Sequence, residues 1–220
     1  MQTIAQILGS QVTNRPRRII YELDDIKKGI QAFKQIGMYL EPAYEITEKV
    51  MPLVTMLIKY MHGIQSSEFD LLKSIGLWGT PGTGKTLTMK IMQGYISVDE
   101  MKWVKDGQFC SFGFKIVTSR EILSSFAEHG FDGLNKYIIP SVICIDDLGS
   151  EAKIGKHYGN ELNVIEHLIE ERYHYNRMTH FTTNLQESEI EVIYGDRVFS
   201  RLIGSTNFIK LTTMDRRKLK

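Results

Sequence analysis

The stretch Gly79-Thr-Pro-Gly-Thr-Gly-Lys-Thr86 decides the fold. A short apolar segment, Ser74 to Trp78, enters it, and a run with helical periodicity, Lys85 to Ile96, leaves it. Glycines at such positions let successive backbone N–H groups point inward, and the start of a helix favours negative charge. The spacing matches a P-loop placed between a strand and a helix, which predicts a phosphate-binding loop.

Each residue type in this loop has a part in that chemistry. Lys85 is placed to reach the terminal phosphates of a nucleotide, and Thr86 is a ligand for Mg²⁺. The alternative is a flexible glycine turn that matches by chance, and the eight agreeing positions with both flanking elements disfavour it. We therefore expect ATP and Mg²⁺ as cofactors. The predicted nucleotide-binding residues of the loop are Gly79, Thr80, Pro81, Gly82, Thr83, Gly84, Lys85, Thr86 and Leu87.

A second stretch, Val142-Ile-Cys-Ile-Asp-Asp147, is an apolar strand that ends in two carboxylates. Strands buried on both faces are typical of parallel sheets, whose ligands bind at the carboxyl ends of the strands. As in a Walker B strand, Asp146 would hold Mg²⁺ together with Thr86. Asp147, pointing the other way along the pleat, would orient or deprotonate the water that attacks the γ-phosphate. A plain strand-end turn is the alternative for Asp-Asp-Leu-Gly.

Short apolar strands alternate with amphipathic helices from residue 74 onward. This order predicts an α/β fold: a parallel five-stranded sheet with flanking helices around the P-loop. Thr118 and Glu121 have the spacing of a capping box at the start of a helix. The expected strands are Ser74–Trp78, Phe114–Thr118, Ser141–Asp146, His180–Thr183 and Asn207–Leu211, and the expected helices are Lys85–Ile96, Ser119–His129, Glu161–Tyr175 and Glu187–Tyr194.

The first part of the chain has helical periodicity. Residues 1–40 are predicted to be a short helical N-terminal extension that could serve as a partner adaptor, and residues 41–220 to be the ATPase domain. One helix carries an apolar stripe of Ile26, Ile30, Phe33 and Ile36 and can end at Gly37, and a second helical run that includes Ile46 and Met61 is interrupted by Pro52. We expect Pro52 to kink or split that run. The stripes are core contacts or, alternatively, a groove for a partner.

Composition limits the class of protein. The chain has 220 residues, 42% of them apolar, and a formal net charge of +1, which fits one globular core with a short extension. Two cysteines are too few for a disulfide framework. The sequence contains neither a signal peptide pattern nor an apolar stretch of about 20 residues, so we expect a cytoplasmic protein without a membrane partner.

Taken together, these motifs resemble those of AAA+ ATPases, and within them the DnaC-type helicase loaders and the related IstB-type transposition ATPases. The resemblance covers about two thirds of the chain. The residues that carry it are the P-loop, Ile145-Asp-Asp-Leu-Gly149, Glu171-Arg-Tyr173, Thr182-Thr-Asn-Leu185 and Asp196-Arg-Val-Phe-Ser-Arg-Leu202.

The resemblance assigns roles to two further polar residues. Asn184 matches the sensor 1 position, where an amide hydrogen-bonds the γ-phosphate or the attacking water. Arg201 matches the arginine finger, a guanidinium presented to ATP in the neighbouring subunit, and Arg197 is the alternative. The catalytic residues implied are Lys85, Asp147, Asn184 and Arg201.

Other parts of the family pattern have weaker counterparts in this chain. Arg217, or alternatively Arg216, falls where sensor 2 would lie and would contact the nucleotide. Arg172 would help to form a subunit interface or lie on a solvated helix face. Only 36 residues follow Asn184, so the C-terminal helical lid is expected to be abbreviated.

The function implied by the resemblance is that of an Mg-dependent ATPase acting in DNA replication. It would bind and hydrolyse ATP, form a homo-oligomer when ATP is bound, and control the assembly of a replicative helicase on DNA. An IstB-like ATPase that assists a transposase is one alternative, and a nucleotide-gated binding module with negligible hydrolysis is another. Single-stranded DNA is a further expected partner, although the basic residues Arg15, Arg17 and Arg18 are equally consistent with solvated charge.

Overall fold

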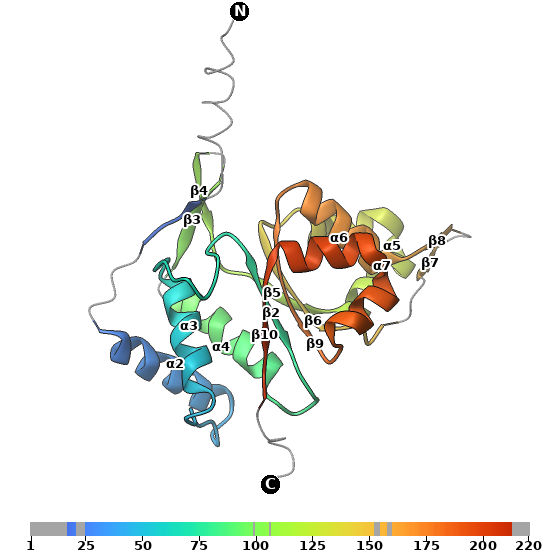
Figure 1. Cartoon of the computed structure of the whole chain (residues 1–220). Helices are drawn as coiled ribbons and strands as arrows, with labels where there is room; N and C mark the ends of the chain where they lie inside the picture. Colours follow the sequence, from blue (N-terminus) through green and yellow to red (C-terminus); the bar gives the residue numbers. More distant parts are fainter. Residues whose placement is uncertain are drawn as a thin grey trace, which may run out of the picture.

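A parallel five-stranded sheet forms the centre of the molecule. The computed structural model describes residues 17–20, 25–98, 100–105, 107–151, 155–157 and 160–212. The sheet order is β10-β2-β9-β6-β5 (Figure 1). All five predicted strands are present, and their ends differ from the prediction by no more than two residues. Their bounds are Ser74–Trp78 for β2, Lys115–Thr118 for β5, Val142–Leu148 for β6, Met178–Thr183 for β9 and Thr206–Lys210 for β10.

Helices cover both faces of this sheet (Figure 1). One face carries α2 (Ile26–Leu40), α3 (Met51–Met61) and α4 (Lys85–Val98), and the other carries α5 (Ser119–Ile138), α6 (Val164–His174) and α7 (Glu187–Gly204). In β6, Cys144 packs into the cluster on the first face, whereas Ile143 and Ile145 pack into the cluster on the second. Burial on both faces explains why β6 is continuously apolar.

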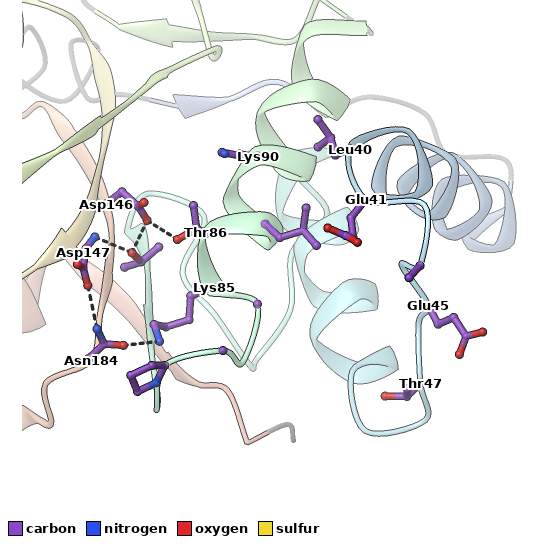
Figure 2. Close-up of a pocket in the computed structure, with 16 residues that line it drawn as sticks. Leu40, Glu41, Glu45, Thr47, Lys85, Thr86, Lys90, Asp146, Asp147 and Asn184 are labelled. Carbon is purple, nitrogen blue, oxygen red and sulfur yellow. Dashed lines mark hydrogen bonds between the residues drawn. The ribbon is translucent and has the colours of Figure 1, made fainter. Parts of the chain in front are cut away.

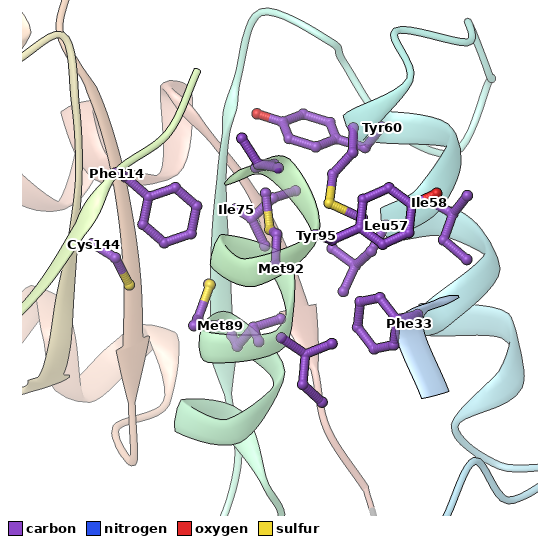
Figure 3. Close-up of a cluster of buried hydrophobic side chains, with 14 of the residues drawn as sticks. Phe33, Leu57, Ile58, Tyr60, Ile75, Met89, Met92, Tyr95, Phe114 and Cys144 are labelled. Atoms are coloured by element: carbon purple, nitrogen blue, oxygen red, sulfur yellow. The ribbon is translucent and has the colours of Figure 1, made fainter. Parts of the chain in front are cut away.

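The helix α2 packs into the main core. Phe33 is fully buried, and its ring lies 6.5 Å from that of Tyr95 on α4 (Figure 3). Ile26, Ile30 and Ile36 pack against the same cluster, so the predicted apolar stripe makes core contacts. The helix continues past its predicted end at Gly37 and stops at Leu40. Gly37 is buried, and the Tyr44 ring packs so closely on it that a Cβ there would lie 2.2 Å from the ring. A partner-binding role for residues 1–40 stays a prediction.

The helix α3 differs from the sequence prediction. It begins at Met51, five residues after Ile46, and Pro52 lies in its first turn. Proline is tolerated there because the first N–H groups of a helix have no intrahelical partner. The predicted kink or split at Pro52 is therefore wrong, and α3 runs without interruption to Met61.

Several short strands were not predicted. β3 (Lys102–Lys105) and β4 (Gln108–Ser111) form an antiparallel hairpin that β1 (Arg17–Arg18) extends to three strands. β7 (Gly155–His157) and β8 (Asn160–Leu162) form a second small hairpin, so the helix predicted from Glu161 starts at Val164. Both hairpins have strands of only two to four residues, too short for a clear alternating pattern. In the part of the chain that the structure describes, no helix has the length and apolar character that crossing a membrane requires.

The start of α5 confirms the predicted capping box. The Thr118 hydroxyl accepts the Glu121 N–H at 3.1 Å, and the Glu121 carboxylate accepts the Thr118 N–H at 2.7 Å. This backbone hydrogen bond lowers the pKa of Glu121. The cap turns the chain from β5 into α5 at the carboxyl edge of the sheet.

Arg172 on α6 is buried and not solvated. It has no exposed surface, so the expected solvated helix face is wrong for this residue. Burial lowers the pKa of Arg172 to about 9, which leaves it charged at neutral pH. The guanidinium donates to the carbonyls of Tyr137, Ile138, Pro140 and Met178 and to the Thr179 hydroxyl, at 2.5 to 3.2 Å. These bonds join the end of α5 and the start of β9 to α6.

We expect Arg172→Met to lower the free energy of unfolding by about 3 kcal/mol, because several buried carbonyls lose their donor. Urea unfolding followed by circular dichroism measures this change. Arg120→Met is the control, since Arg120 is exposed and makes one long hydrogen bond of 3.4 Å; it should change the same quantity by less than about 0.5 kcal/mol. Equal losses in the two variants would contradict the structural role of Arg172.

Candidate functional site

A cavity of about 880 Å³ lies at the carboxyl ends of β2, β9 and β6 (Figure 2). The loop after β2, the end of β6 and the end of β9 form one wall. The connection between α2 and α3 forms the opposite wall. The residues that line the cavity are Leu40, Glu41, Ala43, Glu45, Thr47, Pro81, Gly82, Gly84, Lys85, Thr86, Leu87, Lys90, Asp146, Asp147, Thr182 and Asn184.

The loop from Gly79 to Gly84 takes the conformation that its glycines permit. Gly79 and Gly84 have φ angles of 151° and 91°, which residues with side chains rarely adopt. A Cβ at Gly79 would also lie 2.5 Å from the Leu211 carbonyl oxygen. The loop therefore turns directly from β2 into the first turn of α4, as the sequence pattern predicts.

Lys85 lies at the start of α4 with its ammonium group inside the loop. Its side chain is largely buried, and Nζ donates to the carbonyl oxygens of Gly79 at 2.6 Å and Thr80 at 3.0 Å. Nζ also donates to Asn184 Oδ1 at 2.8 Å. The positive charge is thus fixed between the carbonyl oxygens at the start of the loop and Asn184.

The carboxylate of Asp146 is bound by two hydroxyl groups. Thr86 Oγ1 donates to Asp146 Oδ1 at 2.8 Å, and Thr182 Oγ1 donates to the same oxygen at 2.6 Å. Thr182 is almost completely buried, and its hydroxyl also accepts the Asp147 N–H at 2.9 Å. Thr182 opens the Thr182-Thr-Asn-Leu185 motif, but a threonine in a strand has no distinctive signal that would predict this contact with the two aspartates.

Asp147 departs from the geometry of a regular strand. Its φ of 58° is left-handed, and the pairing of β6 with β9 shifts between Ile145 and Leu148. The expectation that Asp146 and Asp147 point to opposite sides of the pleat is therefore wrong. Both carboxylates line the same cavity (Figure 2).

Asn184 connects the lysine and the second carboxylate. Its Nδ2 donates to Asp147 Oδ1 at 2.8 Å, while its Oδ1 accepts from Lys85. This requires the end of β9 to lie between β2 and β6, which is its place in the sheet order. The structure thus brings Lys85, Asp147 and Asn184 together.

The sequence analysis missed the opposite wall of the cavity. Leu40, Glu41, Ala43, Glu45 and Thr47 come from the end of α2 and the connection to α3 (Figure 2). This segment has no motif, and its place depends on how α2 packs against α4. Only the tertiary structure could assign it to the site.

The predicted arginines lie elsewhere or outside the described residues. Arg201, on α7, is not among the residues that line the cavity, and its Nη1 donates to Glu170 Oε1 at 2.8 Å. Arg197 forms an ion pair with the same oxygen, and its Nε lies 2.9 Å from it. Arg216 and Arg217 lie outside the described residues.

The residues present fit a magnesium ion held partly by a ligand's own oxygens. Asp146 and Thr86 supply hard oxygen atoms, and Mg²⁺ is commonly held by one or two carboxylates together with substrate phosphates. Among the described ranges, no group of three or more His, Cys, Asp or Glu residues is placed to hold a metal ion by itself. Asp146 and Thr86 are the protein oxygen donors that such an ion would meet beside the glycine-rich loop.

The fold is shared with solved replication proteins. A DnaI crystal structure matches with a TM-score of 0.58 and 16% identity over 80% of this chain and 89% of that one. The DnaC helicase loader matches with a TM-score of 0.58 and 17% identity, over 79% and 96% of the two chains. The initiator DnaA, solved with AMPPCP and single-stranded DNA, matches with a TM-score of 0.54 and 13% identity over 78% and 49%.

These structural matches define the fold class. The chain has the same fold as DnaI and the DnaC helicase loader, in which a parallel five-stranded sheet is flanked by helices. No protein-family model matches the sequence, and no curated protein does either.

We expect Thr182→Val to lower the free energy of unfolding by about 1 to 2 kcal/mol, because the Asp147 N–H loses its acceptor and Asp146 loses a donor. Thr182→Ser keeps the hydroxyl and is the matched control. Urea titration of the two variants beside the parent chain measures the difference. If valine is tolerated as well as serine, the hydroxyl does not hold the two aspartates together.

Proposed function

We propose that the protein is an ATPase that acts in DNA replication, with the cavity as its Mg·ATP site. One observation carries the proposal: Lys85, Asn184 and Asp147 form a continuous hydrogen-bonded chain beside the Thr86–Asp146 pair, at the mouth of the P-loop. This places a cation, an amide and two carboxylates around one phosphate-binding loop. Phosphoryl transfer needs such positioned charges and no covalent intermediate.

Each group has a defined task in this proposal. Lys85 and the loop N–H groups bind the phosphates, and Asp146 and Thr86 hold Mg²⁺, which supplies charge neutralisation at the phosphate oxygens. Asp147 orients or deprotonates the attacking water, and Asn184 fixes that carboxylate. The nucleotide base and ribose would lie against the wall formed by Leu40 to Thr47. Arg201, or Arg197 beside it, completes the site of a neighbouring subunit in an ATP-bound oligomer.

The proposed role is to control the assembly of a replicative helicase on DNA, in the cytoplasm. Support comes from the fold shared with the DnaC helicase loader and from the loader-like order of motifs along the chain. The DnaA structure with AMPPCP and single-stranded DNA adds support for nucleotide and DNA as ligands.

Asp147→Asn should abolish ATP turnover and leave ATP affinity within about threefold, because the amide cannot deprotonate water but fills the same space. Lys85→Ala should instead lose ATP binding. Phosphate release and titration with a fluorescent ATP analogue separate the two effects. Loss of binding in Asp147→Asn would mean that the roles of the two aspartates are wrongly divided. Absence of turnover in the parent chain at every protein concentration would favour a nucleotide-gated binding module.

The role in replication predicts ATP-dependent partners. With a non-hydrolysable ATP analogue, the parent protein should bind the replicative helicase of its source cell and single-stranded DNA, and Lys85→Ala should bind both at least about tenfold more weakly. Analytical ultracentrifugation with the helicase and fluorescence anisotropy with an oligonucleotide measure this. A parent protein that turns over ATP but binds neither partner would remove the replication role and leave the ATPase proposal intact.

A further inference from the structure

Two arginines of α7 share one carboxylate of α6. Arg201 Nη1 donates to Glu170 Oε1 at 2.8 Å, and Arg197 forms an ion pair with the same oxygen, with Nε 2.9 Å away. The Arg201 guanidinium also lies over the ring of Tyr173, 5.3 Å from its centroid. Glu170 and Tyr173 are one turn apart on α6, so this helix contacts Arg201 through an ion pair and a cation–π contact.

The two arginines are not held equally. The Arg201 side chain is 24% exposed, whereas that of Arg197 is 72% exposed. Arg201 therefore has a restricted set of orientations, and Arg197 reaches further into solvent. Because the two lie four residues apart on one helix, their like charges repel each other, and Glu170 is the carboxylate that offsets this repulsion.

We propose that Glu170 is a positioning residue for the arginine that α7 presents to the neighbouring subunit's ATP. Its carboxylate fixes the direction of the Arg201 guanidinium and keeps Arg197 and Arg201 together as one unit. Tyr173 supports Arg201 through its ring. Glu170 acts on the nucleotide only through the arginines, and it acts in the subunit that donates them.

The inference rests on the proposed ATPase function, and mixing two inactive variants tests it separately. The donor subunit carries Lys85→Ala, so it binds no ATP but offers its arginines. The acceptor subunit carries Arg197→Ala and Arg201→Ala, so it binds ATP but offers no arginine. Turnover in the mixture then arises only where a donor meets an acceptor.

Adding Glu170→Gln to the donor should lower kcat of the mixture at least about tenfold and leave KM for ATP nearly unchanged. The reason is that a misplaced guanidinium weakens the stabilisation of the transition state and leaves ATP binding unaffected. The same substitution in the acceptor is the control and should leave the mixture unchanged. Glu170→Asp in the donor should restore part of the rate. A purely structural defect would lower the rate from either position.

The possible failures are distinguishable. If the donor with Glu170→Gln is as active as the donor without it, Glu170 does not position the arginine, while the arginine in trans stands. A second failure is a mixture of the original donor and acceptor that shows no turnover although the unmodified protein hydrolyses ATP. In that case the arginine does not act in trans, and both that part of the proposed function and this inference are overturned.

Discussion

The site depends on the hydrogen bonds made by the buried hydroxyl of Thr182. This hydroxyl joins β9 to the end of β6 by donating to Asp146 and accepting from the Asp147 N–H. The left-handed backbone at Asp147 leaves that N–H outside the regular pairing of the two strands, and the threonine replaces the lost partner. Two carboxylates consequently face one cavity, where a regular strand would separate them.

The sheet order places the groups around the two aspartates. β9 lies between β2 and β6, so Asn184, the residue that follows its last residue, reaches both the loop lysine and Asp147. Packing of α2 against α4 then brings the segment after Leu40 over the loop and closes the cavity from the other side. The wall that contains the glycine-rich loop and the opposite wall are therefore positioned by the same hydrophobic core, which contains Phe33 and Tyr95.

The buried guanidinium of Arg172 holds α5, α6 and β9 together. Arg172 joins α6 to the start of β9 and to the end of α5, and it lies between Glu171 and Tyr173 in the sequence. Glu170 and Tyr173 are consequently held at a defined place relative to the sheet. The contacts of α6 with Arg201 therefore hold this arginine, which is proposed to act on the ATP of a neighbouring subunit, at a defined place relative to the sheet of its own subunit.

The sequence by itself determined the order of the five sheet strands and of the helices between them from residue 74, together with the P-loop pattern, the acidic pair and Asn184, because these features are local patterns of spacing and polarity. It did not determine the side on which Asp147 lies, since a left-handed residue breaks the alternation that sequence reasoning assumes. Nor could it place Thr182, the wall from Leu40 to Thr47, or the burial of Arg172. These depend on contacts between segments distant along the chain, and only the packing of helices on the sheet decides which side chains meet.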